Sequence, residues 1–404
     1  MLPAKVLPTE QEVLSTTRIE PRPTAIRTCT RCIMDTSDPD ITFDANGVCN
    51  HCHIFDRVFA DMLSGTARTE ALERYVDRIR RAGRGKSYDC VVGLSGGVDS
   101  SFLALEAVRM GLRPLVVHLD NGWNTEIAVR NIELILRKLK LDLYTVVLDW
   151  EEFRDLQLAF LRASTPDSEI PTDHAILAAV YQTAWKMDIP YLVMGTNRAT
   201  ELVLPRAWSQ GHQDWRYIRN VQARFGTRPL RRFPHLNIAS YARFRLWNEG
   251  RVLNLLEYID YTRDGAIETL EREVGWRNYG GKHYESIYTR FFQGWILPHK
   301  FGFDKRRAHL SNKILAGQST RHAALAEMRK SPYPSATLAE HDREYVIKKL
   351  GITEVDFEGI MRTPPKRYED YPNMYNSRAF LAVRGAYRLA RGGLERAGLL
   401  PAAG

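Results

Sequence analysis

The stretch "VVGLSGGVDSS" at residues 91–101 places a loop rich in glycine and serine directly after an apolar run. Followed by a helical pattern, it predicts a buried strand, a turn and a helix N-terminus, where backbone N–H groups converge on an anion. The loop offers two glycines that let an anion approach the backbone and three hydroxyl donors, at Gly96, Gly97, Ser95, Ser100 and Ser101. Asp99 would repel a phosphate unless a cation lay between them, so we expect magnesium to bridge Asp99 and a polyphosphate.

The order of residues in this loop excludes two common nucleotide motifs. No lysine follows the glycines, as the mononucleotide P-loop requires, and the Gly-x-Gly-x-x-Gly order of dinucleotide folds is absent. The segment "SGGVDSS" instead resembles the pyrophosphate loop (PP-loop) of the ATP pyrophosphatases, which include asparagine, GMP and NAD synthetases and the tRNA thiolases. The resemblance implies that ATP is cleaved between its α and β phosphates, that pyrophosphate stays in the loop, and that AMP is placed on a substrate oxygen.

Three strand ends form the ATP site that this resemblance implies. "HLDNGWN" (residues 118–124) and "GTN" (residues 195–197) follow two further apolar runs and would be the adenine and ribose walls. The ATP-binding residues implied are Gly93, Leu94, Ser95, Gly96, Gly97, Val98, Asp99, Ser100, Ser101, Leu119, Asp120, Asn121, Gly195, Thr196 and Asn197. His118 is expected to be a structural histidine at a strand end.

Short apolar runs alternate with helical patterns around the PP-loop. The runs predict buried parallel strands at 88–94, 114–119, 143–148 and 190–195. The helical patterns that would connect them lie at 101–110, 125–139, 151–163 and 174–188. This alternation predicts an α/β fold with a doubly wound parallel sheet, and the resemblance of the loop implies that the sheet is of the ATP pyrophosphatase type.

The rest of the chain divides into regions of different character. We predict an N-terminal arm at 1–27, a four-cysteine segment at 28–60, the PP-loop domain at 61–235 and a helical substrate-binding and partner region at 236–404. A helix at 68–82 opens the PP-loop domain, and helical patterns follow near 240–249, 264–274, 286–297, 305–316 and 337–349. The helical region is expected to pack against the carboxyl ends of the strands, where open α/β sheets bind ligands.

Four of the five cysteines form two close pairs, "CTRC" and "CNHC", separated by 16 residues. This spacing predicts a structural zinc site made by Cys29, Cys32, Cys49 and Cys52, with an iron–sulfur cluster as the alternative. A turn signal at Asp44, Asn46 and Gly47 predicts a hairpin between the pairs. His51 and His53 are expected to be bystanders, and Cys90 an inert residue of the first strand.

The composition indicates the class of protein but does not identify its ligand. The formal net charge of +9 favours anionic partners, and basic clusters interleaved with aromatics lie at 224–233 and 299–309. No apolar run approaches the roughly 20 residues that a membrane span requires, and the N-terminus lacks a signal-peptide pattern. We therefore expect a cytoplasmic protein with no membrane insertion.

The number of cysteines in this chain helps to decide between two branches of the ATP pyrophosphatases, those that transfer sulfur and those that use ammonia. Sulfur-transfer members need thiols near the adenylate, and only Cys90 is left if the metal takes four. Ammonia is therefore the expected nucleophile, and we do not expect a nucleic-acid partner. A tRNA-modifying thiolase that uses a cluster at the four-cysteine site is the alternative, and a zinc-bearing nucleotide-binding scaffold is a third, non-enzymatic hypothesis.

Three segments together resemble the N-acetyl sugar amidotransferases of lipopolysaccharide and O-antigen biosynthesis. They are the four-cysteine segment, the loop "GLSGGVDSS" and the block "WRNYGGKHYESIYTRFFQGWILPHKFGFDKRRAHLSNKILAGQSTRHAAL". The resemblance implies an ATP-dependent conversion of an acetamido group on a nucleotide-linked sugar, such as UDP-2,3-diacetamido-2,3-dideoxy-mannuronic acid, into an acetamidino group. It also implies a separate glutaminase with a cyclase-like barrel protein, similar to the pair in histidine biosynthesis, because no glutaminase nucleophile is visible here.

Two basic stretches within this block are the candidate sugar-nucleotide site. The predicted substrate-binding residues are Lys282, His283, Tyr284, Glu285, Lys300, Asp304, Lys305 and Arg306. Lys282 follows two glycines, so its ammonium could reach the adenylated oxygen or a phosphate and act in catalysis beside Asp99. His174 is a candidate to relieve ammonia of a proton, and Asp173 is expected to cap a helix.

Overall fold

A five-stranded, fully parallel sheet forms the centre of the protein. The computed structural model describes residues 26–197, 201–237, 239–240, 251–281 and 284–377. The strands lie in the order β3-β2-β1-β4-β5. Their bounds are β1 (Cys90–Gly93), β2 (Pro114–Asp120), β3 (Leu143–Val147), β4 (Tyr191–Met194) and β5 (Val252–Asn254). Because the strand order reverses at β1, the carboxyl ends of β1 and β4 mark the topological switch point where such sheets bind ligands.

The predicted doubly wound α/β fold is confirmed, with two differences at the sheet edges. β3 is an edge strand in which Leu143 and Val147 are 41% and 69% exposed, so the prediction that this run is buried was wrong. Its apolar residues pair on one side only, with β2. β5 was not predicted, because three residues are too short to give a periodic signal.

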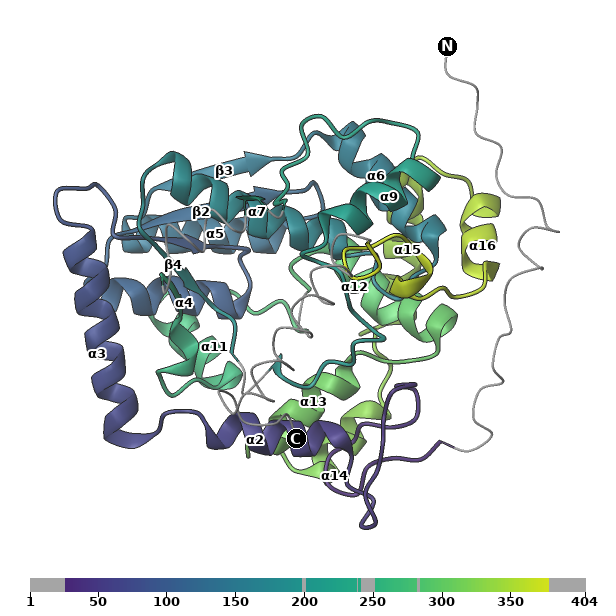
Figure 1. The fold of residues 1–404 in the computed structure, drawn as a ribbon, viewed down its shortest axis with the longest axis horizontal. Helices are drawn as coiled ribbons and strands as arrows, with labels where there is room; N and C mark the ends of the chain where they lie inside the picture. Colours follow the sequence, from purple (N-terminus) through teal and green to yellow (C-terminus); the bar gives the residue numbers. More distant parts are fainter. Residues whose placement is uncertain (1–25, 198–200, 238, 241–250, 282–283, 378–404) are drawn as a thin grey trace, which may run out of the picture.

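Helices cover both faces of the sheet, as Figure 1 shows. The helices around the strands are α3 (Gly65–Ala82), α4 (Val98–Arg109), α5 (Glu126–Leu139), α6 (Trp150–Ala163) and α7 (Ile170–Lys186). On one face, α7 packs alanines and Val180 against β1 and β2. On the other face, α4 packs against β1 and β2, and α3, α5 and α11 complete the same apolar cluster.

The C-terminal half is mostly helical, as predicted. Its elements are α9 (Trp215–Phe225), η1 (Leu255–Glu257), α11 (Arg263–Val274), α12 (Ile287–Phe291), η2 (Phe292–Phe301), α13 (Arg306–Leu315), α14 (Arg321–Met328), α15 (Ala336–Leu350), α16 (Glu354–Arg362) and η3 (Tyr368–Asp370). The single helix predicted at 286–297 is α12 followed by the π-helix η2, which contains Pro298. The helix predicted at 240–249 falls almost entirely outside the described residues. The four-part division of the chain stays a prediction.

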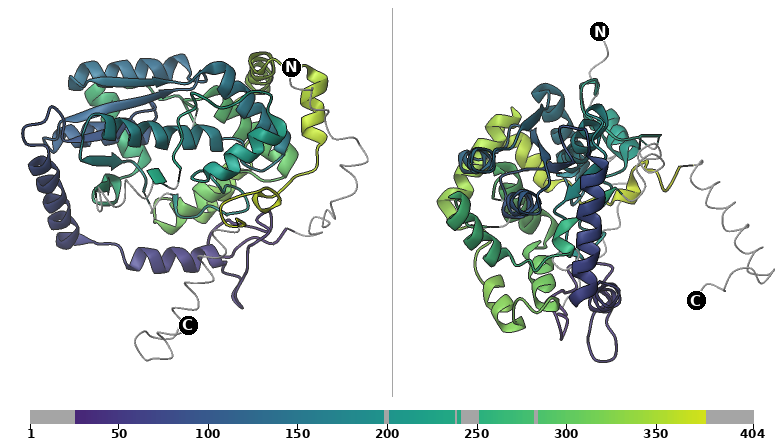
Figure 2. Two further views of the ribbon diagram at one scale, coloured as in Figure 1. Left: turned by 45° about the horizontal axis from the view of Figure 1, so that its top comes forward. Right: turned by 90° about the vertical axis from the view of Figure 1, so that its left-hand side faces the viewer.

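The cysteine segment packs against the C-terminal half of the chain. Figures 1 and 2 show this purple segment, which ends in α2 (Asn50–Ala60), beside the green helices α13 and α14. The Arg321 guanidinium donates to the carbonyl oxygens of Cys29 and Cys32 at 2.9 and 3.0 Å. Arg307 pairs with Asp35 at 3.1 Å. Within the described residues, no helix is both long enough and apolar enough to cross a membrane.

Candidate active site

A cavity of about 610 Å³ opens at the carboxyl ends of β1, β2 and β4. Its walls come from the PP-loop, from one face of α7 and from the C-terminal region beyond residue 260. α7 precedes β4 and crosses back over the sheet, so its N-terminus lies at the carboxyl ends of the strands. We call the part of the cavity wall formed by the PP-loop the PP-loop end, and the part at the start of α7 the acceptor end.

The PP-loop turns sharply out of β1 into α4. Gly96 has a φ of +80°, and a Cβ atom there would lie 2.4 Å from the carbonyl oxygen of Ala128, so only glycine fits. The Ser95 hydroxyl lies 3.1 Å from the Ser100 hydroxyl and accepts a hydrogen bond from the N–H of Gly97 at 3.2 Å. The loop thus gathers two hydroxyls and the first amides of α4, as an anion site requires.

Three aromatic residues from the C-terminal region contact this loop, and none of them was predicted as a site residue. Trp276 donates its indole N–H to the carbonyl oxygen of Gly96 at 3.1 Å, and the Tyr279 hydroxyl accepts from the N–H of Val98 at 3.2 Å. Tyr261 donates its hydroxyl to the Asp99 carboxylate. The aromatic and glycine-rich stretch "WRNYGG" was the available signal, but the contacts span more than 160 residues of sequence.

Asp99, Arg263 and Glu285 are among the charged side chains at the PP-loop end. All three line the cavity, and a Cβ atom added at Gly97 would lie 3.1 Å from the Glu285 carboxylate oxygen Oε1. Burial and the Asp99 carboxylate raise the pKa of Tyr261, so its hydroxyl stays protonated and donates. Arg263 is a guanidinium beside the loop that the sequence analysis missed.

The other predicted ATP residues divide between the cavity wall and its support. The wall contains Gly93, Leu94, Ser95, Gly97, Val98, Asp99, Ser100, Leu119, Asn121, Gly195 and Thr196. The remaining four are not part of it. Asp120 accepts from the N–H of Gly122, and Asn197 donates to the carbonyl oxygen of Leu256 at 3.4 Å. The carbonyl oxygen of Gly96 accepts from the Trp276 indole, and Ser101 is fully buried in α4.

The acceptor end carries polar side chains that reach the cavity from several separate segments. Its residues are Glu169, Asp173, Ser209, His212, Gln293 and Lys305. Gln293 donates to Glu169 Oε2 at 2.8 Å, and the Lys305 ammonium lies 3.9 Å from the same oxygen. Asp173 lies in the first turn of α7, which begins after Glu169, so the prediction that Asp173 caps a helix was wrong.

Of the predicted substrate residues, the described structure places Glu285 and Lys305 in the cavity wall. Tyr284 donates to the carbonyl oxygen of Pro332 at 2.7 Å, and Asp304 pairs with Arg306 at 2.7 Å; none of these three lines the cavity. Lys300 is buried away from it and donates to the carbonyl oxygens of Ile360 and Thr363. Lys282 and His283 lie outside the described residues.

His174 is fully buried behind the cavity rather than in its wall. Its Nδ1 donates to the carbonyl oxygen of His212 at 2.7 Å, and its Nε2 accepts from the N–H of Leu236 at 3.0 Å. Burial lowers the pKa of His174 to about 4. With both ring nitrogens bound to backbone groups, this imidazole positions the chain around it and has no nitrogen left for a substrate proton.

His118 is likewise held at both ring nitrogens. Nδ1 lies 2.8 Å from the carbonyl oxygen of Leu94 and Nε2 lies 3.1 Å from the Asn124 amide nitrogen. The ring ties the second strand to the PP-loop, the strand-end role expected for it.

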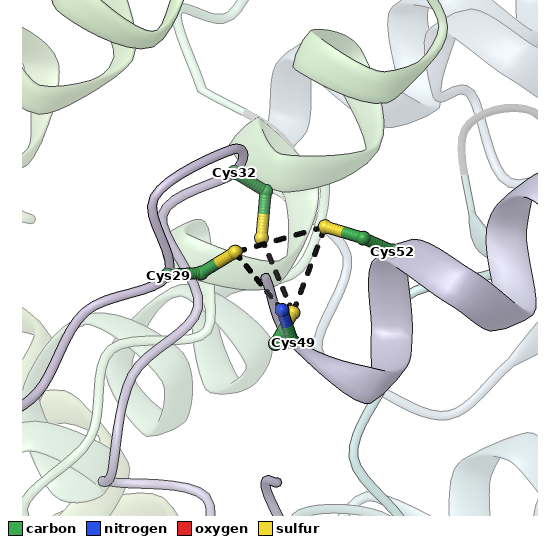
Figure 3. A group of neighbouring side chains, drawn as sticks. All are labelled: Cys29, Cys32, Cys49 and Cys52. Atoms are coloured by element: carbon green, nitrogen blue, oxygen red, sulfur yellow. Dashed lines mark hydrogen bonds between the residues drawn. The ribbon is translucent and has the colours of Figure 1, made fainter. Parts of the chain in front are cut away.

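The four predicted cysteines converge on one point, as Figure 3 shows. Their sulfur atoms all lie within 4.8 Å of one another, and the hydrogen-bonded pairs are 3.6 to 3.8 Å apart. Four thiolates about 2.3 Å from a zinc ion would be about 3.8 Å apart, so the spacing fits a closed tetrahedral site. Hydrogen bonding to the neighbouring sulfurs raises the pKa of Cys52, which a bound cation would reverse.

The predicted hairpin and bystander histidines surround this cluster. Phe43 and Cys49 form an antiparallel β-bridge. Gly47 has a φ of +77°, and its N–H donates to the carbonyl oxygen of Asp44 at 3.0 Å. His51 and His53 lie 2.7 and 3.0 Å from aspartate oxygens. Neither ring is therefore needed to complete the four-sulfur set.

Cysteines are absent from the wall of the cavity, and all five lie within the part of the chain that the structure describes. Cys90 is fully buried in β1, and burial raises the pKa of its thiol. A low-reactivity thiol of this kind is the inert residue that the sequence predicts.

Comparison with known proteins gives one family match, which lies in the C-terminal region. Residues 285–384 match the family model described as the C-terminal domain of LPS biosynthesis protein WbpG-like, which agrees with the resemblance drawn from the sequence block. No curated protein matches the chain. Its fold is similar to the NH3-dependent NAD synthetase from Campylobacter jejuni (16% identity, 52% of this chain and 85% of that chain, TM-score 0.28). It is also similar to NMN synthetase from Francisella tularensis (12% identity, 72% of this chain and 98% of that chain, TM-score 0.34).

Proposed function

We propose that this protein, which carries the C-terminal domain of the WbpG-like LPS biosynthesis proteins at residues 285–384, is an ATP-dependent amidotransferase acting on a nucleotide-linked sugar. The proposed reaction converts an acetamido group, as in UDP-2,3-diacetamido-2,3-dideoxy-mannuronic acid, into an acetamidino group. One observation carries the proposal. The PP-loop and residues of the WbpG-like domain, among them Glu285, Gln293 and Lys305, line the same cavity.

The residues at the PP-loop end suit activation of an amide oxygen by ATP. The Ser95 and Ser100 hydroxyls and the amides at the start of α4 would hold the β and γ phosphates as the amide oxygen attacks the α-phosphate in line. Magnesium, held by Asp99 with Glu285 beside it, would neutralise charge on the leaving pyrophosphate. Arg263 would add a fixed positive charge at this end, so its wall supplies positioning and electrostatic stabilisation.

Ammonia is the nucleophile that the site supports best. A sulfur carrier would need a thiol at the adenylate, and no cysteine lines the cavity within the described residues. We further propose that a separate glutaminase with a cyclase-like barrel protein supplies the ammonia. The four cysteines would hold structural zinc, because a closed four-sulfur site leaves no open coordination position for chemistry.

Mass spectrometry tests the reaction directly. The protein is incubated with the UDP-linked diacetamido sugar acid, MgATP and ammonium chloride. We expect a product in which one amide oxygen is replaced by NH, together with one AMP and one pyrophosphate per product. The proposal is wrong if no diacetamido sugar nucleotide gives this product. ATP turnover stimulated by tRNA and a sulfur donor would favour the thiolase instead.

A further inference from the structure

The acceptor end contains a carboxylate that is held at one oxygen only. Glu169 is 8% exposed and lines the cavity. Its Oε2 accepts from Gln293 and lies near Lys305, whereas its Oε1 has no hydrogen-bond partner among the described residues. Because Glu169 lines the cavity, this oxygen can accept a hydrogen bond from a ligand or water there.

A second unsatisfied group lies in the same wall. The Nδ1 atom of His212 is buried and has no hydrogen-bond partner within the described part of the chain. Its Nε2 lies 3.4 Å from the Ser209 hydroxyl, which donates to Asp167. Two polar groups in the acceptor-end wall, Glu169 Oε1 and His212 Nδ1, can therefore hydrogen-bond to a polar ligand or to water.

The charge around Glu169 favours a cationic ligand. Asp167 and Asp173 add two further carboxylates to that of Glu169, and Lys305 is the cation that offsets them. Burial raises the pKa of Glu169, and the Lys305 charge opposes that rise. Burial opposes the charge of Lys305, but the three carboxylates outweigh it and raise the pKa of Lys305. With Lys305 charged, the cluster keeps an excess of negative charge and a carboxyl that can exchange a proton.

The proposed reaction must dispose of one proton at this point. Ammonia forms a C–N bond to the adenylated carbon, the C–O bond to AMP breaks, and AMP leaves with the electron pair. Of the three hydrogens on the attacking nitrogen, two remain in the cationic amidinium product and one leaves as a proton. A nearby carboxylate suits both needs, because it accepts that proton and neighbouring carboxylates stabilise the amidinium charge.

We propose that Glu169 accepts the proton lost by the attacking ammonia, and that Asp173 in the cavity wall stabilises the positive charge that remains on the acetamidino product, with Asp167 adding negative charge behind the wall. The inference rests on the proposed amidotransferase function. It places the acetamido group between the two ends of one cavity, with the adenylated oxygen toward the PP-loop and the attacking ammonia toward Glu169. The sequence suggested His174 as the group that takes a proton from ammonia. In this proposal Glu169, five residues earlier, has that role.

The two half-reactions separate Glu169 from the rest of the site. Adenylation is followed by sugar-dependent exchange of labelled pyrophosphate into ATP without ammonia, and amidination by product formation with ammonium chloride. For Glu169→Gln we expect exchange within about twofold of the native protein and amidination slower by about 10²- to 10⁴-fold. Glu340→Gln, an exposed glutamate of α15, is the matched control and should change neither rate.

A second variant gives a readout that a purely structural role would not produce. Lys305→Met removes the charge that lowers the pKa of Glu169, so amidination should rise with pH at a higher pH than in the native protein. The other ionisable groups near Glu169, namely Asp167, Asp173 and Tyr288, are unchanged in this variant. Hydroxylamine serves as the nucleophile in this profile, because it is largely unprotonated at neutral pH.

The outcomes distinguish the two proposals. Normal amidination by Glu169→Gln, or an equal loss of exchange and amidination, would overturn the role of Glu169 and leave the amidotransferase intact. An unshifted profile for Lys305→Met would also count against Glu169. Absence of both exchange and amidination in the native protein, with every diacetamido sugar nucleotide, would overturn the proposed function and the role of Glu169 with it.

Discussion

The four-cysteine cluster and the PP-loop were both predicted from short motifs, but they are built in different ways. The cluster takes all four sulfurs from residues 29–52, closes on itself and is completely buried. The PP-loop is local only in its backbone, since Tyr261, Trp276 and Tyr279 reach it from the distant C-terminal region. When all the ligands of a site lie in one segment, the sequence predicts the whole site. When distant parts of the chain complete a site, the sequence predicts only the local residues.

The two regions are also connected through the C-terminal helices. Arg307 in α13 and Arg321 in α14 hold the cysteine segment, and Lys305, at the N-terminus of α13, lines the cavity. The cluster therefore supports the helix that presents an acceptor-end cation. We expect its loss to affect stability first and activity as a consequence.

The largest expected effect is that of removing the metal from the cluster. Cys49→Ser, or treatment with a strong chelator, should destabilise the segment by up to about 10 kcal/mol, because a structural zinc site is folded by its ion. Thermal unfolding with parallel measurement of metal content tests this. We expect one zinc ion per chain in the native protein and a much lower melting temperature without it.

Cys90→Ala is the matched control, since Cys90 is a buried cysteine of β1 that lies outside the cluster. It should leave the metal content unchanged. If the native protein contains iron and sulfide and no zinc, the four cysteines bind an iron–sulfur cluster. Sulfur transfer would then be favoured as the reaction.

The second effect, at the PP-loop, should fall on activity and not on folding. Asp99→Asn keeps a group that can accept from Tyr261 but removes the charge expected to hold magnesium. ATP turnover should fall by about 10³-fold, or about 4 kcal/mol, with little change in melting temperature. Asp264→Asn, whose side chain is 81% exposed on α11, is the control and should be active. Normal turnover by Asp99→Asn would exclude Asp99 from catalysis.

The sequence predicted those features whose cause is local. The PP-loop is recognisable because Gly96 needs a positive φ and close approach to Ala128, and both demands appear as glycine at that position. The burial of β3 was mispredicted because apolarity indicates a strand but not whether another strand pairs with its far edge. The cysteine spacing succeeded because a tetrahedron restricts loop length.

The acceptor end was predicted poorly because residue type alone does not fix burial or partners. Lys300 and Lys305 are alike in sequence, but one donates to backbone carbonyls behind the cavity and the other pairs with Glu169 in its wall. Glu169 gave no signal at all, since a lone glutamate before a helix is commonplace. Its environment is set by Gln293 and Lys305, which lie more than 120 residues away.

The smallest expected effect decides whether His174 belongs to the chemistry or to the support. Burial lowers the pKa of His174 from 6.5 to about 4. Between these two pH values the histidine of the unfolded chain binds a proton that the histidine of the folded chain does not. Stability should therefore fall as the pH decreases below about 6.5, by about 2 kcal/mol between pH 7 and pH 5. In His174→Gln, whose amide can still donate to His212 and accept from Leu236, this loss should disappear. Urea unfolding of both proteins at the two pH values measures it. Amidination should be retained in a folded His174→Gln protein; if it is abolished there, His174 is catalytic and the role assigned to Glu169 is wrong.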